Sequence, residues 1–573
     1  MAKSDAYLVF TLHTHLPFVL NHGRWPHGSD WLCEVAVECY LPLAAAFRRL
    51  AEDDVPAALT MNISPVLCEQ LASAAFREEV DAYLAHRREA CDSTRRHFVD
   101  QHDEGLAALT DYWAAQYDRA RADLDALHGD ILGAYRRLAE RGTVELITTG
   151  ATHGYMPLLS RDESVDLQFR VAVATHTRHF GQAPRGAWLP ECAYRPRYEW
   201  TPPVGPHSGK KRYRRRGVEE HLAAHNLGFF FTDTHLMRGG RALSAYGDYY
   251  PRLRTVQGPE TQLTRRGRDH SPYVPHRVAS RGGTGDAAAY VRDPETTLQV
   301  WSRDAGYPGD GAYLEFHKRH FPGGLRLWRV TDPKADLGLK QPYQPERADE
   351  RTRAHAAHFV SLAGDVIDRH ARRLGGPGVL CTPFDAELFG HWWAEGPAWL
   401  ERVLRLTDDR GVTATTASAC LDQFPVQQAV TLLEGSWGEG GDHRVWLNKD
   451  TEWTWEMVYQ AEDDLWSFAA TPGWARHPLL RRLVAQLGRE LLLIQASDWQ
   501  FLITTWAARN YAETRFAEHC ADFRRLHELA KRVRDGGALT WDEEQFLGGK
   551  EAQDFCFPDI AEHIEAAAAL PQP

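Results

Sequence analysis

Short apolar runs that end in a polar or aromatic residue recur along the chain, and helical patterns separate most of them. The six runs are residues 7–12, 144–148, 186–189, 227–231, 297–300 and 378–381. They lead to His13, His153, Glu191, Asp233, Trp301 and Asp385. Repeated units of strand and helix form parallel sheets, which deliver the carboxyl ends of their strands to one edge. The pattern therefore predicts an α/β fold, either a parallel barrel or a doubly wound sheet, with these six side chains at one end.

Long segments rich in Ala, Leu, Arg and Glu interrupt and follow this pattern. Residues 65–141 contain few β-branched residues and are predicted to be a helical insertion, either a wall of the cleft or a structural cap. The strand pattern is absent after residue 396, so residues 397–573 are predicted to form a helical C-terminal domain, with one helix over 501–532. The catalytic domain would comprise residues 1–64 and 142–396, with long loops between 246 and 293.

Charge and composition exclude several classes of protein. The 66 Lys and Arg against 78 Asp and Glu give a formal net charge of −12, so a nucleic-acid partner is not expected. The basic run at 210–216 is predicted to be a solvated loop rather than an anion site. No stretch approaches the roughly 18 apolar residues of a membrane span, so no membrane partner is expected. The nine cysteines form no CxxC pair, which favours reduced thiols and a cytoplasmic location.

Two of the polar strand ends, Glu191 and Asp385, are carboxylates among aromatic residues, a combination suited to cleavage of glycosidic bonds. One carboxylate attacks or stabilises the cationic sugar while the other protonates the leaving oxygen. The acid needs a raised pKa from an apolar setting, whereas the nucleophile needs cationic or hydrogen-bonding neighbours, such as Arg195 or the histidines. Glu387 is an alternative to Asp385 for the role of acid.

Other catalytic classes have less support in the sequence. The chain contains no P-loop, no GxGxxG after a strand, no GxSxG elbow and no HExxH. His13 and His15 would point the same way from an extended strand. A metal-dependent hydrolase, with these two histidines and an Asp as ligands as in polysaccharide deacetylases, therefore stays open.

Five segments, in order along the chain, resemble the motif regions of glycoside hydrolase family 57. The segments are His13-Thr14-His15-Leu16-Pro17, Gly150-Ala151-Thr152-His153-Gly154, Trp188-Leu189-Pro190-Glu191-Cys192-Ala193-Tyr194, Phe384-Asp385-Ala386-Glu387-Leu388-Phe389-Gly390-His391-Trp392-Trp393 and Ser436-Trp437-Gly438. Within the family the sequence is most similar to the 1,4-α-glucan branching enzymes. The resemblance implies a distorted, TIM-like (β/α)7 barrel with a helical inserted domain and a helical C-terminal domain.

The resemblance also implies roles for individual residues. Glu191 would be the nucleophile and Asp385 the general acid/base of a retaining double displacement, with no metal and no cofactor. His13, His15 and His153 would then contact the sugar at the scissile bond, which weakens the deacetylase hypothesis. Further substrate contacts would come from donor-site residues, aromatic cleft walls and one aspartate: Arg292, Trp301, Gly309, Trp25, Trp437, Trp446 and Asp498.

One loop and one departure from the family pattern concern transfer rather than cleavage. Branching requires that water be excluded from the glycosyl-enzyme until a glucan hydroxyl arrives. The family uses a tyrosine on a flexible loop for this purpose, and Tyr246 matches that position. After Asp498, however, family members carry Gly-Gln where this chain has Trp506-Ala507, so acceptor binding is expected to differ.

The leading hypothesis is a 1,4-α-glucan branching enzyme. Such a transglycosylase cleaves α-1,4 linkages in amylose-like or glycogen-like glucans and forms α-1,6 branches. One alternative is an α-1,4-glucan hydrolase or 4-α-glucanotransferase of the same family. Another, from a different class, is a catalytically silent glucan-binding protein. The expected partner in each case is an α-glucan polysaccharide, and the sequence predicts no particular oligomeric state.

Overall fold

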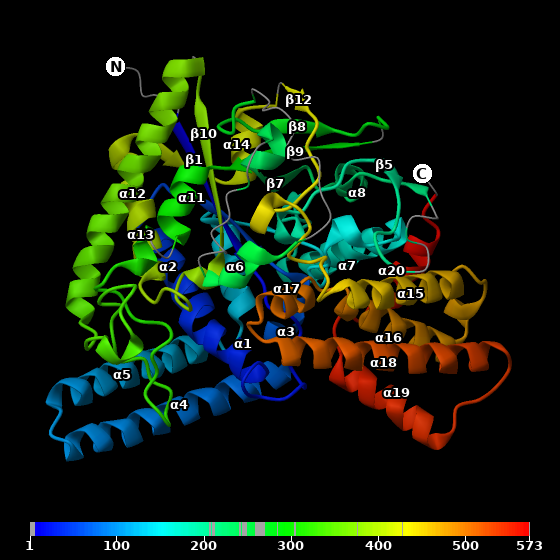
Figure 1. Cartoon of the computed structure of the whole chain (residues 1–573), viewed down its shortest axis with the longest axis horizontal. Helices are drawn as coiled ribbons and strands as arrows, with labels where there is room; N and C mark the ends of the chain where they lie inside the picture. Colours follow the sequence, from blue (N-terminus) through cyan, green and yellow to red (C-terminus); the bar gives the residue numbers. More distant parts are fainter. Residues whose placement is uncertain are drawn as a thin grey trace.

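The structure is a computed structural model that describes residues 6–205, 208, 212–239, 242, 249–257, 270–283, 285–302, 305–374, 376–426 and 428–571. A barrel occupies its centre, as Figure 1 shows. A helical hairpin projects at the lower left of that view, and a stack of helices formed by the last part of the chain lies at the lower right.

Seven strands form a ring of parallel pairings, in the order β1-β2-β3-β4-β7-β9-β10 and back to β1. The bridge between Thr148 and Ala187 joins β3 to β4, and the pair Cys381–Arg292 joins β10 to β9. The predicted α/β class and the (β/α)7 barrel are thus confirmed. The strands are β1 (Ala6–Thr14), β2 (Leu59–Ile63), β3 (Val144–Ile147), β4 (Gly186–Ala187), β7 (Phe229–Asp233), β9 (Asp286–Arg292) and β10 (Gly378–Asp385).

The central strands are covered on both faces. Every residue of β1 and every residue of β10 is buried, as expected for parallel strands that have side chains inside the barrel and helices outside it. The covering helices include α1 (Ser29–Val35), α2 (Leu41–Glu52), α7 (Asp162–Phe180), α8 (Val218–Ala224), α12 (Pro345–Leu374) and α13 (Gly396–Leu406). In Figure 1 the long helix α12 runs beside β1 and β10.

One strand assignment made from the sequence is wrong, and two barrel strands were not predicted. Residues 297–300 belong to a helix, α11 (Pro294–Trp301), and not to a strand. The side chain of Asp293 caps this helix by accepting a hydrogen bond of 2.7 Å from the Thr296 N–H, and Pro294 occupies the first turn. These start signals outweigh the β-branched residues of a short run. The strand that precedes α11 is β9, and it lies in the region that the sequence predicted to be loops. The strand β2 was also not predicted.

The insertion is helical, as the sequence predicted. Residues 65–141 fold into α3 (Pro65–Ala72), α4 (Ala74–Asp100), α5 (Glu104–Ala126) and α6 (Ile131–Glu140). The antiparallel pair α4 and α5 is the hairpin that projects in Figure 1. Arg95–Asp111 and Arg88–Asp118 ion pairs, with N–O distances of 2.8 Å and 3.1 Å, connect the two helices along their length.

The chain beyond residue 396 is mainly helical, with two corrections to the prediction. The strand β11 (Val412–Ala414) pairs with β1, and β12 (Ala429–Val430) pairs with β8 (His276–Ala279), so strands continue past 396. The single helix expected over 501–532 is divided at Trp506, where φ is +60°. The α-helices that follow α13 are α14 (Ala417–Gln423), α15 (Glu452–Ala469), α16 (Pro478–Ile494), α17 (Asp498–Thr505), α18 (Arg509–Arg534), α19 (Trp541–Gln553) and α20 (Ile560–Ala568). The domain boundary at 396/397 stays a prediction.

The described part of the basic run is not a solvated loop. Tyr213–Arg215 form β6, antiparallel to β5 (Tyr198–Trp200). Arg215 is buried, and its Nε atom lies 2.6 Å from Oδ1 of Asp162. A buried ion pair thus uses one of these cations internally. Within the described ranges, every helix is too short or too polar to cross a membrane.

Candidate active site

The carboxyl ends of the barrel strands bring the predicted polar residues together. His13, near the end of β1, pairs in register with Asp385 on one side and Asn62 on the other. Asp233, at the end of β7, pairs with Arg292 at the end of β9. Glu191 follows β4 in a short turn. The site is therefore assembled from strands that are far apart in sequence, at the edge where parallel barrels place their chemistry.

Glu191 is held in an uncommon backbone conformation between two hydrogen-bond donors. Its φ and ψ are +60° and +24°, a left-handed region that is rare for residues other than glycine and concentrated at functional sites. The indole N–H of Trp437 donates to Oε2 over 2.9 Å. The hydroxyl of Ser497 donates to Oε1, also over 2.9 Å. Both oxygens of Glu191 thus have donors from the C-terminal third of the chain.

The carboxyl groups influence one another. Burial raises the pKa of Glu191 to about 8, and the charge of Asp385 acts in the same direction, whereas the hydrogen bonds from Trp437 and Ser497 lower it. Burial and the charge of Asp385 also raise the pKa of Glu387 to about 8. A raised pKa was expected of the acid, and hydrogen-bond donors were expected beside the nucleophile. Glu191 has both properties.

Glu387, the alternative acid, is bound by two hydrogen-bond donors. Its Oε1 accepts a hydrogen bond of 2.8 Å from the Tyr40 hydroxyl and one of 3.2 Å from the His15 backbone N–H. These contacts connect the turn after β10 to the start of the His15 loop. Glu387 therefore fixes the backbone that presents His15.

Three imidazoles and an indole form a compact stack beside Glu191. The ring of His13 lies parallel to that of Trp188, with 4.7 Å between centroids. The rings of His15 and His153 are 4.2 Å apart. Burial is the main reason why the pKa values of His13 and His153 lie well below the ordinary histidine value. These two rings are therefore neutral at neutral pH and offer hydrogen bonds rather than positive charge.

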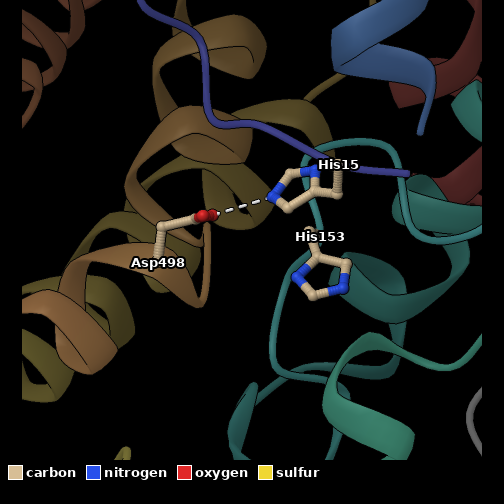
Figure 2. A group of neighbouring side chains, drawn as sticks. All are labelled: His15, His153 and Asp498. Carbon is tan, nitrogen blue, oxygen red and sulfur yellow. Dashed lines mark hydrogen bonds and ion pairs between the residues drawn. The ribbon is translucent and has the colours of Figure 1, made fainter. Parts of the chain in front are cut away.

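Hydrogen bonds from three parts of the chain orient this stack. Figure 2 shows the His15 ring directed at Asp498, whose Oδ2 lies 3.0 Å from Nε2. The other ring nitrogen of His15 is 2.8 Å from the Ser64 hydroxyl. Nδ1 of His153 is 2.9 Å from the Ser497 hydroxyl, and the His13 ring bonds to Asn62.

His15, His153 and Asp498 could offer ligand atoms within 4.8 Å of one another. The rings of His15 and His153, however, are stacked with an angle of 23° between their planes (Figure 2). The lone pairs of their ring nitrogens therefore do not point toward a common position. A zinc site needs converging lone pairs at about 2.0–2.1 Å. This geometry suits the hydroxyl groups of a sugar better than a shared metal ion.

Of the neighbours that the sequence named for Glu191, a histidine lies beside it, with Nδ1 of His153 3.8 Å from Oε1, but Arg195 does not. The guanidinium of Arg195 is fully buried, with its carbon 6.0 Å from the centre of the Tyr198 ring, and its main charged neighbours are Arg215 and Asp162. The prediction for Arg195 is therefore wrong. Arg292 is the cation on this side of the cleft: it pairs with Asp233 and lies 5.5 Å from the centre of the Trp437 ring.

Two of the predicted donor-site residues, Trp301 and Gly309, line a pocket of about 180 Å³ that is also lined by Tyr249, Tyr250 and Trp392, whereas Arg292 is not part of its lining. Trp301 packs against Trp392, with 5.8 Å between ring centroids, and Gly309 lies in the short helix Tyr307–Gly309 at the pocket wall. Aromatic surfaces of this kind accommodate the apolar faces of sugar rings.

The three aromatic residues expected in the cleft walls have different environments. Trp437 contacts Glu191 directly. Trp25 is 82 % exposed, after a loop that begins at the end of β1. Trp446 is only 1 % exposed and stacks on Tyr155 at 4.5 Å, so one face of its ring is already covered.

The sequence analysis connected two residues, Tyr246 and Trp506, with glucan transfer, and the structure describes only one of them. Tyr246 lies outside the described residues. Trp506 has the left-handed backbone that favours glycine, is 57 % exposed, and has the guanidinium carbon of Arg252 4.2 Å from its ring centre. The indole at this departure from the family pattern is therefore held against a cation at the surface.

Asn62, Ser64 and Ser497 belong to the site but were not predicted. Asn62 lies in β2 and Ser64 lies directly after it. The polar end of this strand precedes Pro65, where the helix α3 starts. That signal was present in the sequence. Ser497 is next to Asp498 in the chain, but its contact with Glu191 depends on how the C-terminal helices dock against the barrel.

Comparisons with known proteins support a family assignment. Residues 9–431 match the model of glycosyl hydrolase family 57, and residues 457–564 match the model described as 1,4-alpha-glucan branching enzyme, C-terminal. The chain is 40 % identical over 533 residues to the 1,4-alpha-glucan branching enzyme TK1436 of Thermococcus kodakarensis, covering 92 % of this chain and 74 % of that protein.

Solved structures agree with these matches. The crystal structure of TK1436 has a TM-score of 0.88 at 37 % identity, with coverage of 99 % of this chain and 97 % of that chain. The GH57-type branching enzyme of Pyrococcus horikoshii gives 0.87 at 37 %, covering 99 % and 98 %. The alpha-amylase AmyC of Thermotoga maritima gives 0.77 at 26 %, covering 98 % and 99 %. From its barrel, its strand-end site and these matches, the chain is a member of glycosyl hydrolase family 57.

Proposed function

We propose that this protein is a 1,4-α-glucan branching enzyme that cleaves α-1,4 linkages and forms α-1,6 branches. The main observation is that the segment resembling the branching-enzyme C-terminal region contributes directly to the site. From that segment Ser497 contacts Glu191, and Asp498 contacts His15. The similarity to two branching enzymes over almost the whole chain supports the same conclusion.

In the proposed mechanism Glu191 attacks the anomeric carbon and Asp385 protonates the leaving oxygen. The two residues would share one proton at neutral pH, because two charged carboxyls at close range repel each other. The donors Trp437 and Ser497 favour the ionised form of Glu191, since an ionised acceptor makes the stronger hydrogen bond. Burial raises the pKa of Glu191 to about 8, so the mechanism requires these donors to keep Glu191 ionised and leave the proton on Asp385, where the leaving group needs it.

The remaining site residues would bind and orient the sugar. The neutral rings of His13 and His153, together with the ring of His15 that Asp498 orients, would offer hydrogen bonds at the scissile bond. Arg292, Trp301 and Gly309 would hold the donor chain. Trp25, Trp437 and Trp446 are proposed as aromatic walls. After cleavage, Asp385 would accept the proton of the attacking glucan hydroxyl.

The test is to incubate the enzyme with amylose and follow three quantities. Branching lowers iodine staining, releases few reducing ends and produces new α-1,6 linkages in the proton NMR spectrum. Abundant reducing ends without α-1,6 signals would refute the proposal.

The similarity to AmyC favours a second candidate, hydrolysis or disproportionation of α-1,4-glucans. Tyr246 is proposed to exclude water from the intermediate, so the Tyr246→Ala variant discriminates between the two functions. A branching enzyme should shift toward hydrolysis in this variant, whereas a hydrolase should keep its product ratio. The third alternative, a silent glucan-binding protein, predicts the same glucan turnover in the Glu191→Gln variant as in the wild type.

We place the protein in the cytoplasm, with amylose-like or glycogen-like glucan as its partner and a role in glycogen biosynthesis. All nine cysteines are unpaired and buried, which suits a reducing compartment.

We divide the chain into a catalytic domain (1–64 and 142–396), a helical insertion (65–141) and a C-terminal domain (397–573). Loss of enzyme from the cytosolic fraction, or glycogen unchanged in a deletion strain, would contradict the location or the role.

A further inference from the structure

Three buried polar side chains, Glu462, Gln495 and Gln168, form a continuous row between the C-terminal helices and the barrel. Glu462 lies on α15, Gln495 caps the end of α16, and Gln168 lies on α7. All three are almost completely buried. None of them touches the cleft residues directly, so the proposed mechanism assigns them no role.

Every hydrogen bond in this row points in the same direction. The Gln495 amide donates to Oε1 of Glu462 over 3.0 Å, and the Gln168 amide donates to the oxygen of Gln495, also over 3.0 Å. Oε1 of Gln168 accepts from the backbone N–H of Thr152 over 3.1 Å. The direction is fixed at the barrel end, because the Thr152 N–H can only donate. At the other end burial raises the pKa of Glu462 to about 7, while the Ser160 N–H and the Gln495 amide each donate to one of its oxygens.

Both ends of the row are anchored. Oε2 of Glu462 accepts from the N–H and the hydroxyl of Ser160, over 2.8 Å and 2.5 Å. The Gln168 amide also donates to the Thr152 hydroxyl over 3.1 Å, and that hydroxyl bonds to the Leu492 carbonyl of α16. A Cβ at Gly154 would come within 2.7 Å of the Gln168 amide nitrogen, so the packing leaves no room for a larger residue there.

The two chain segments at the end of this row carry the side chains around the nucleophile. Gly154 forms an antiparallel bridge with Ala496, and the Ser497 N–H donates to the His153 carbonyl over 3.1 Å. From this paired backbone, the Ser497 hydroxyl reaches both Glu191 and Nδ1 of His153, each over 2.9 Å.

We propose that Glu462, acting through Gln495 and Gln168, is a positioning residue that aligns Ser497 and His153 with the nucleophile. The inference rests on the proposed function, since it assumes that Glu191 acts at the reaction centre. Its physical basis is preorganisation, because a donor that is already oriented needs no rearrangement when charge develops. The row makes the docking of the C-terminal helices a condition for an active barrel.

The substitution Glu462→Gln tests the proposal with almost no change of shape. An amide nitrogen in place of Oε2 would face the N–H of Ser160. In place of Oε1 it would face the Gln495 amide, which would have to turn over and force Gln168 to present a donor to the Thr152 N–H. In either arrangement two buried N–H donors face each other without an acceptor, which strongly disfavours the hydrogen-bonded arrangement of Glu462, Gln495 and Gln168.

The measurement is the pH dependence of kcat/KM for transfer from amylose, together with the thermal midpoint. Ser497→Ala should move the acid limb upward, because the Ser497 hydrogen bond lowers the pKa of Glu191. Glu462→Gln should move the same limb in the same direction, with a loss of up to about tenfold in kcat/KM on that limb for a shift of about one pKa unit. The double variant should shift no further than Ser497→Ala alone.

The matched control is Glu490→Gln, on α16. Glu490 is also fully buried, but it bonds to His519 on α18 and not to a member of the row. This variant should change the thermal midpoint without moving the limb. An unmoved limb in folded Glu462→Gln, or additive shifts in the double variant, would overturn the proposal. If Glu462→Gln does not fold, Gln168→Met interrupts the row from the barrel side and should move the same limb.

The outcomes separate this proposal from the proposed function. Shifts of the alkaline limb in both Ser497→Ala and Glu462→Gln would support the positioning role and refute the assignment of Glu191 as nucleophile. The absence of α-1,6 products would refute branching, while the pH limbs would still report whether Glu462 acts through Ser497.

Discussion

Replacing Trp437 with phenylalanine should reveal which carboxyl group holds the catalytic proton. The variant loses the indole N–H that lies 2.9 Å from Oε2 of Glu191 but keeps an aromatic ring beside Trp188. A hydrogen bond to a charged group contributes about 1.5–3 kcal/mol, which corresponds to roughly one to two pKa units. The Trp437 hydrogen bond lowers the pKa of Glu191, so its loss raises that pKa.

The limb that moves depends on the role of Glu191. If Glu191 is the nucleophile, it is charged in the active form and in the form that has lost both protons. The loss of the donor then raises only the acid limb, by about one to two units, and lowers kcat/KM by about 10- to 100-fold at a pH below that limb. The alkaline limb stays in place. If Glu191 is the acid, the alkaline limb rises and the acid limb stays in place.

The assay is the initial rate of transfer from amylose at subsaturating concentration between pH 5 and 9. Trp399→Phe is the matched control, because Trp399 is fully buried and its indole nitrogen has no hydrogen-bond partner among the residues that the structure describes. That variant should lower the thermal midpoint through the cavity it leaves and keep both limbs in place. An unmoved acid limb in a folded Trp437→Phe variant would refute the assignment.

Three further predictions follow from the same structure. Glu191→Gln and Asp385→Asn should each lower turnover of amylose on the order of a thousandfold or more, with circular dichroism unchanged; a smaller loss would contradict their roles. Arg292→Met leaves the buried carboxylate of Asp233 without its arginine partner, with His235 still beside it, and should destabilise the protein by up to about 3–5 kcal/mol, measured as a loss of urea resistance that an added Asp233→Asn substitution partly restores. Burial raises the pKa of Glu395 from 4.5 to about 7, so the folded state holds a proton that the unfolded state releases, and the free energy of unfolding should fall by up to about 3 kcal/mol as pH rises through that window. Glu395→Gln is neutral at every pH, so the fall between pH 5 and pH 8 should be smaller in this variant; an identical fall would refute the reasoning.

Much of the barrel could be predicted because its strands are read locally. The runs that became β1, β3, β4, β7 and β10 are apolar and end in polar residues, and this pattern is what a parallel strand buried on both faces requires. The exceptions are informative. β9 has the alanine-rich sequence DAAAYVR, whose small residues give a weak strand signal, and α11 depends on the Asp293 cap rather than on the propensity of its residues.

The site was predictable only where a residue lies at a strand end or within a recognisable motif. Glu191, Asp385 and His13 meet that condition. Arg195 does not, although it is four residues from Glu191, because its side chain packs toward Tyr198 instead. Sequence proximity fixes the distance between two backbone positions and leaves the direction of each side chain open.

The sequence by itself determined the class of fold through its short-range patterns of apolar and polar residues, and the family through five motif segments that resemble it. It also singled out Glu191 and Asp385 as carboxylates that follow apolar runs. The tertiary structure decided what surrounds the carboxylates. Ser497 lies 306 positions from Glu191, and Gln495 lies 327 positions from Gln168, so both contacts exist only once the C-terminal helices dock. Burial at that junction is also what raises the pKa of Glu191 to about 8. Desolvation depends on how the whole molecule packs, so it cannot be inferred from any single stretch of the chain.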